Sequence, residues 1–66
     1  MKELKTYYCT DVPNNDEIEE AILITQTQHC LVSLVWTVFY SSYRVLVQED
    51  DTIESVREKM PKVYGI

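Results

Sequence analysis

The most apolar stretch of the chain is LVSLVWTVFY, residues 31–40, and its hydrophobic residues occupy both parities of an extended strand. A strand in a two-layer domain normally buries one face and exposes the other, so that apolar and polar residues alternate. With the following segment YRVLVQ, residues 43–48, this stretch predicts a β-hairpin that turns at Ser41-Ser42. Why both faces of the first strand are apolar is the question that the pattern raises.

The predicted turn separates the hairpin into two different faces, because directly paired residues point to the same side of a sheet. A turn at Ser41-Ser42 pairs Tyr40 with Tyr43, Val38 with Val45 and Trp36 with Val47. One face is then continuously apolar, and we expect the helices to cover it. That face comprises Val32, Leu34, Trp36, Val38, Tyr40, Tyr43, Val45 and Val47.

The other face mixes apolar residues with hydrogen-bonding ones. It comprises Leu31, Ser33, Val35, Thr37 and Phe39 on one strand and Arg44, Leu46 and Gln48 on the next. An apolar centre with a polar rim is typical of a protein contact. We therefore expect a partner-binding surface formed by Val35, Thr37, Phe39, Arg44 and Leu46. The alternative is an ordinary surface, since small sheets expose some Val and Phe for strand propensity alone.

Two segments flank the hairpin on its N-terminal side. Residues 2–10, KELKTYYCT, are rich in Thr and Tyr and predict a first strand. Residues 14–28 predict a helix, because Asn14 and Glu17 form a capping-box pattern. Apolar or small residues then recur at helical spacing, at Ile18, Ala21, Ile22 and Thr25. The β-branched run ILIT, residues 22–25, leaves a strand open as the alternative.

A short amphipathic helix is predicted within residues 50–61, DDTIESVREKMP, with Asp51 as its cap and Glu54 as the capping-box partner. The element order is therefore strand, helix, strand, strand, helix. It predicts a single small α+β domain over residues 1–66, with two helices on one face of a three-stranded mixed sheet.

The charge balance limits the partners. Eleven acidic and six basic residues give a net charge of -5, whereas nucleic-acid-binding domains are usually basic. Direct nucleic-acid binding is therefore disfavoured, although aromatic residues on the sheet leave a single-stranded nucleic-acid-binding module as an alternative. A second alternative is an inhibitor that mimics phosphate through an acidic surface at the two helix starts. The residues of that surface are Asp16, Glu17, Glu20, Glu49, Asp50 and Glu54. The charge could instead serve only solubility.

Catalytic and metal-binding patterns are weak. His29-Cys30 lacks the spacing of a zinc site, and neighbours on a strand point to opposite sides. Cys9 and Cys30 are expected to be free thiols in a reducing cytoplasm. The uncharged run from Ala21 to Tyr43 is long enough to cross a bilayer, but residues 25–29 within it are polar. We expect no enzyme, cofactor, metal, small-molecule substrate or membrane partner, but a cytoplasmic interaction protein: a homodimer, or a regulator or inhibitor of a larger partner.

Overall fold

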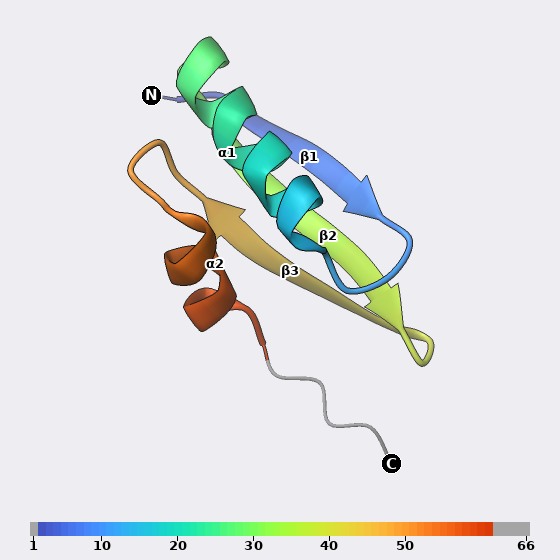
Figure 1. The fold of residues 1–66 in the computed structure, drawn as a ribbon. Coiled ribbons are helices and arrows are strands. Elements are labelled where there is room, and N and C mark those ends of the chain that lie inside the picture. Colours follow the sequence, from blue (N-terminus) through green and yellow to red (C-terminus); the bar gives the residue numbers. More distant parts are fainter. Residues whose placement is uncertain (1, 62–66) are drawn as a thin grey trace.

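The computed structural model describes residues 2–61 and contains three strands and two helices (Figure 1). They follow in the order β1 (Leu4–Cys9), α1 (Asn15–Gln28), β2 (Leu31–Val38), β3 (Ser41–Val47) and α2 (Ile53–Lys59). The sheet has the order β1-β2-β3; β1 and β2 are parallel, and β2 and β3 are antiparallel. The predicted α+β fold with a three-stranded mixed sheet is confirmed.

Helix α1 begins and ends at residues whose local chemistry favours those boundaries. The Asn14 side chain accepts a hydrogen bond from the Glu17 amide (2.8 Å), and the Glu17 carboxylate accepts one from the Asn14 amide (3.0 Å). The predicted capping box is therefore confirmed, and residues 22–25 are helix rather than strand. His29 ends the helix in the left-handed conformation (φ 50°, ψ 50°), which redirects the chain into β2.

The hairpin turns two residues earlier than predicted. Phe39 and Tyr40, not Ser41-Ser42, are the turn residues, and both have positive φ (51° and 66°), as in the type I′ turn that matches strand twist. The pairs are therefore Val38 with Ser41 and Trp36 with Tyr43, so the predicted pairs were wrong. Because the register moves by an even number of residues, the remaining strand residues keep their predicted sides of the sheet.

The core lies between the sheet and both helices. Its buried residues are Ile18, Ala21, Ile22, Cys30, Val32, Leu34, Trp36, Val45, Val47 and Val56. Trp36 stacks on Tyr43 with ring centroids 6.1 Å apart, which follows from their direct pairing. Tyr40, predicted on this face, lies instead in the turn and is fully exposed. The helices thus cover one face of the sheet, which we call the covered face.

The cap of α2 differs from the prediction by one residue. Thr52 is the N-cap: its amide donates a hydrogen bond to the Ser55 hydroxyl (2.8 Å), and its own hydroxyl accepts one from the Ser55 amide (3.2 Å). Asp51 and Glu54 do not form the predicted pair. Asp51 lies one residue before the cap, where its carboxylate accepts a hydrogen bond from the Ser55 hydroxyl (2.8 Å). The helix is short, and only Val56 of it is fully buried.

Candidate docking face

The face of the sheet opposite the helices is formed by alternate residues of all three strands. We call it the open face. It comprises Leu4, Thr6 and Tyr8 of β1, Leu31, Ser33, Val35 and Thr37 of β2, and Ser42, Arg44 and Leu46 of β3. Both helices contribute their buried residues to the core on the other side, so no helix within residues 2–61 covers it (Figure 1).

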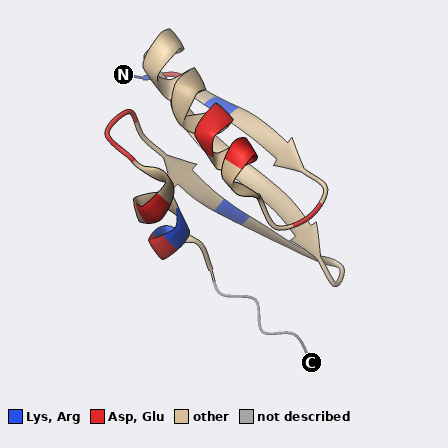
Figure 2. Cartoon of the chain, in the orientation of Figure 1, with Lys and Arg blue, Asp and Glu red and all other residues tan. Residues whose placement is uncertain are grey.

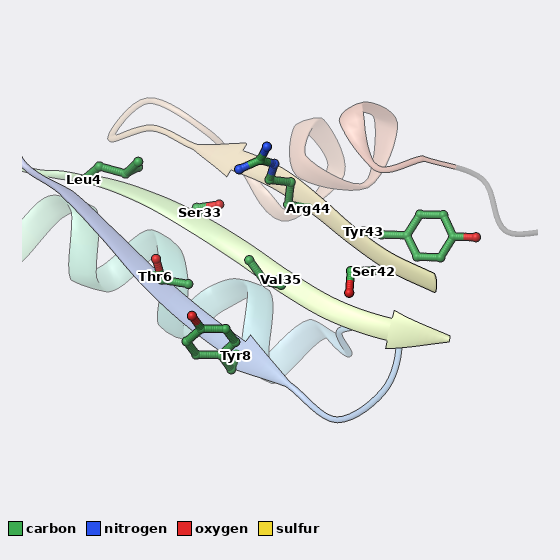
Figure 3. Close-up of a pocket in the computed structure, with 8 residues that line it drawn as sticks. All are labelled: Leu4, Thr6, Tyr8, Ser33, Val35, Ser42, Tyr43 and Arg44. Atoms are coloured by element: carbon green, nitrogen blue, oxygen red, sulfur yellow. The ribbon is translucent and has the colours of Figure 1, made fainter. Parts of the chain in front are cut away.

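Val35 lies at the centre of the open face. The register places Tyr8 of β1 on one side of it and Arg44 of β3 on the other. Figure 3 shows these three side chains across the strands, with Ser33 further along β2. They border a shallow hollow of about 390 Å³, lined by Leu4, Thr6, Tyr8, Ser33, Val35, Ser42, Tyr43 and Arg44. A hollow with an apolar floor, a phenol and a guanidinium can hold an apolar side chain and a neighbouring acceptor.

The structure brings four of the five predicted partner-binding residues together. Val35 is half-buried, while Thr37, Arg44 and Leu46 are exposed on the same face. Phe39 is not part of that face, because it belongs to the hairpin turn. Its predicted place on the strand was wrong, since β2 ends at Val38.

Phe39 and its neighbour Tyr40 form an exposed aromatic tip at the end of the hairpin. Phe39 is 70% exposed and Tyr40 fully exposed. Both have positive φ, a conformation that costs an L-residue other than Gly, Asn or Asp about 1–2 kcal/mol. Asn-Gly would form this turn without that cost. The chain therefore displays two large aromatic rings at a position where they disfavour folding.

Sequence reasoning missed the contribution of β1 to the open face. Leu4 and Tyr8 are both exposed there. The pair Tyr7-Tyr8 does not show which side chain faces the helices, because neighbouring residues of a strand point to opposite faces and these two are identical. In the structure Tyr7 points to the covered side, where its hydroxyl donates a hydrogen bond to Glu20 (2.9 Å). The polar residue Glu20 of α1, which lies within reach of Tyr7, is the one signal that could have shown which tyrosine faces the helices.

The charge of the open face differs from that of the chain. Arg44 is its only charged residue among the residues that the structure describes, whereas the chain as a whole carries -5 (Figure 2). Lys5, the basic residue of β1, points to the covered side and hydrogen-bonds to Gln28. The open face is thus weakly positive and otherwise uncharged.

The predicted acidic residues do not meet in one surface. Asp16, Glu17 and Glu20 lie in the first turns of α1, Glu49 and Asp50 in the loop before α2, and Glu54 in α2. The start of α1 lies beside α2, since Arg57 hydrogen-bonds to Asn15 (2.9 Å). The loop lies at the other end of α1, where Gln26 hydrogen-bonds to the Glu49 carbonyl (3.3 Å). The two groups are separated by most of a helix about 20 Å long.

Basic groups neutralise part of the loop. The Glu49 carboxylate lies 3.2 Å from Lys2 and 3.4 Å from the imidazole of His29. Its pKa is lowered, mainly by the hydrogen bond from Lys2. Asp51 lies 2.6 Å from Lys59. This placement does not favour a phosphate-mimicking surface.

The two thiols lie at opposite ends of the sheet. Cys9 pairs with Trp36, whereas Cys30 directly precedes Leu31, which pairs with Leu4. Both are free, and Cys30 is buried. Burial and a hydrogen bond to Glu17 raise the pKa of the Cys9 thiol to about 12, so little nucleophilic thiolate forms at neutral pH. Residues 2–61 hold no cluster of three or more His, Cys, Asp or Glu side chains that could bind a metal.

The comparisons place the chain in no group of known proteins: no family model, curated protein or solved structure matches it. In the described part of the chain, no helix has the length and apolar character needed to cross a membrane. Fold and site together define a small α+β domain in which the helices of residues 2–61 cover one sheet face and leave the other uncovered.

Proposed function

We propose that this protein is a small non-enzymatic interaction module that regulates or inhibits a protein partner by docking it on the open face. The observation that supports this proposal is a sheet that the helices of residues 2–61 cover on one side only, and whose other side carries Tyr8, Arg44 and Leu46 around Val35. The two free thiols fit a reducing cytoplasm as the place of action.

The residue types of the open face match those that contribute most at protein interfaces. Tyr and Arg are enriched among the residues that dominate binding energy, and both border the hollow over Val35. The weakly positive face favours a partner that presents an apolar side chain beside a carboxylate. Such a carboxylate could pair with the guanidinium of Arg44, which has no salt-bridge partner within residues 2–61.

The aromatic tip extends this surface. Phe39 and Tyr40 lie directly beyond Val38, at the end of the strand whose centre is Val35. Residues held in an unfavourable backbone conformation concentrate at functional sites, where binding compensates for the strain. We therefore include the tip in the docking surface, as a second contact for the same partner.

A matched pair of leucine variants tests the proposal. Leu46 is 41% exposed on the open face, and Leu23 is 55% exposed on α1. Leu46→Asp should abolish capture of the partner from a lysate by the immobilised chain, whereas Leu23→Asp should leave the captured proteins unchanged. Circular dichroism of both variants checks that they fold. Equal loss with both variants, or no loss with Leu46→Asp, contradicts docking on the open face.

A direct binding measurement distinguishes protein docking from the alternative function, single-stranded nucleic-acid binding. On the open face of the described chain, Arg44 is the only basic residue, and Tyr8 is the only aromatic residue whose strand position faces that side. We therefore expect no binding to single-stranded oligonucleotides in fluorescence anisotropy at low salt. Binding that weakens steeply as salt increases would favour the nucleic-acid module instead.

A further inference from the structure

The outer edge of β1 has free backbone groups. The Glu3 carbonyl accepts a hydrogen bond from the Leu31 amide (2.9 Å), so Glu3 directs its backbone toward β2. Along any strand, successive residues direct their backbone N–H and C=O groups toward opposite edges. The amides and carbonyls of Leu4, Thr6 and Tyr8 therefore point away from the sheet, and no hydrogen bond joins them to any of residues 2–61.

The other edge of the sheet is covered at one point, beside α2. The Lys59 side chain of α2 donates a hydrogen bond to the outward carbonyl of Leu46 in β3 (2.7 Å). Natural sheets commonly protect their edges with such a cover, a proline, a bulge or a charged side chain on the edge strand. β1 has no cover, proline or bulge in residues 4–9, and its one charged residue, Lys5, points to the covered side, where it hydrogen-bonds to Gln28. An unblocked edge is a template for adding another strand.

We propose that the protein forms a homodimer in which the β1 edges of two copies pair antiparallel about a two-fold axis at Thr6. The two three-stranded sheets then become one sheet of six strands. The edge is self-complementary, because Thr6 meets Thr6 of the second copy while Leu4 and Tyr8 meet Tyr8 and Leu4. All six outward residues of the two strands are hydrogen-bonded in this register.

The register centred on Thr6 also pairs the side chains well. On the open face, Leu4 packs against Tyr8 of the second copy, an aliphatic–aromatic pair that stabilises antiparallel strands. On the covered side, Lys5 lies opposite Tyr7 of the second copy, whose hydroxyl is bonded to Glu20. The Lys5 ammonium thereby approaches a carboxylate, and symmetry makes this contact twice. A register centred on Tyr7 would lose both the Leu4–Tyr8 pair and the Lys5–Tyr7 pair.

The dimer would also enlarge the docking surface. Because a two-fold axis perpendicular to the sheet keeps both helix layers on one side, the open faces of the two copies become continuous. The pairing does not depend on the docking function, since backbone groups of β1 form it, whereas docking also uses side chains far from that edge, such as Leu46 of β3.

The decisive variant is Thr6→Pro. The Thr6 amide points outward, so proline removes no hydrogen bond within the sheet, and edge strands tolerate proline at such positions. It does remove the central inter-copy donor and places a ring in the interface. We expect sedimentation over a concentration series to give twice the 7.8 kDa chain mass for the wild type and for the matched control Thr6→Val, but the monomer mass for Thr6→Pro.

Two further variants separate this dimer from other associations. Lys5→Glu should raise the dimer dissociation constant at least tenfold, because it places like charges beside Glu20, whereas Leu46→Asp should leave it unchanged. A monomeric wild type at millimolar concentration, or a dimeric Thr6→Pro, overturns the proposal. Monomerisation by Leu46→Asp alone would mean that the open faces pair with each other.

Hydrogen exchange gives a test that needs no variant. In the wild type, the amides of Leu4, Thr6 and Tyr8 should become protected as concentration rises, while the outward amides of Ser42 and Arg44 in β3 should not change. Concentration-independent exchange of the three β1 amides would refute edge pairing even if Thr6→Pro failed to fold.

Discussion

The covered and open faces of the sheet are formed by the same strands and by similar residue types, but only the covered face is buried under the helices. On β2, Leu34 and Trp36 are buried under the helices, while Val35 between them lies on the face that no helix covers. Strand propensity does not explain the difference, since Val35 and Trp36 are both strand formers and lie on opposite faces. The difference is set by the pleat, which assigns alternate residues to opposite faces, and by the single apolar stripe of α1, which can cover only one of them.

The strongest test of this difference compares two leucines of the hairpin. Leu34 is 0% exposed on the covered face, and Leu46 is 41% exposed on the open face. Leu34→Ala should lower the free energy of unfolding by about 2–5 kcal/mol, a large part of the stability of so small a domain. Leu46→Ala should lower it by less than about 1 kcal/mol. Urea unfolding curves measure both, and a larger effect at Leu46 would mean that the faces are assigned the wrong way round.

This assignment could be made from the sequence, whereas the hairpin turn could not. The parity of Val32, Leu34 and Trp36 survives any even shift of register, so the predicted covered face is correct although the turn was misplaced. The turn itself gives no signal, because Phe39 and Tyr40 are poor residues for positive φ. Ser41-Ser42 is the better turn pair by composition, but the observed register places Trp36 opposite Tyr43, where their rings stack.

The N-cap of α1 could be predicted from the sequence, whereas the N-cap of α2 could not. The Asn14–Glu17 capping box is confirmed, and the apolar stripe begins directly after it at Ile18. Near α2, Asp51, Thr52 and Ser55 offer overlapping capping patterns, and the sequence alone does not choose among them. The direction of β1 side chains was unpredictable, since Tyr7 and Tyr8 are identical residues on opposite faces.

The aromatic tip tests whether residues outside the covered face are retained for docking rather than folding. Replacing Phe39 and Tyr40 with Asn and Gly should raise the free energy of unfolding by about 1–2 kcal/mol, because those residues adopt positive φ more easily. The same variant should weaken partner capture by the immobilised chain. A shift of the urea midpoint to lower concentration would show instead that the two rings stabilise the fold.

The carboxylate of Asp51 tests how firmly α2 is held on the covered side. It accepts hydrogen bonds from the Gln48 amide (2.8 Å) and from Lys59 (2.6 Å). Burial opposes its ionisation, but these donors and Ser55 outweigh burial and lower its pKa. Asp51→Asn should therefore lower the free energy of unfolding by about 1 kcal/mol at neutral pH.

The pH dependence of that loss has a definite sign. Because the pKa of Asp51 is lower in the folded state, its contribution is present above the ordinary aspartate value of 3.8 and is lost as pH falls through the folded value. The stabilities of wild type and Asp51→Asn, measured by urea unfolding, should converge in acid. A constant difference at all pH values would show that the charge of Asp51 does not contribute.

The smallest expected effect compares the adjacent tyrosines of β1. Tyr7, on the covered side, donates a hydrogen bond to Glu20 (2.9 Å), and this bond, with smaller contributions from burial and nearby acidic groups, raises its pKa to about 12. The stabilisation is therefore present below 10.0, the ordinary pKa of tyrosine, and is lost as pH rises toward 12. Because water screens this partly exposed site, Tyr7→Phe should lower the free energy of unfolding by only about 0.5 kcal/mol at neutral pH.

Tyr8→Phe, on the open face, is the matched control and should cost nothing measurable, because the Tyr8 hydroxyl has no hydrogen-bond partner among the described residues. Equal costs for the two variants would mean that the helix layer does not distinguish the two sides of the edge strand, and the contrast between the faces would then end at β2.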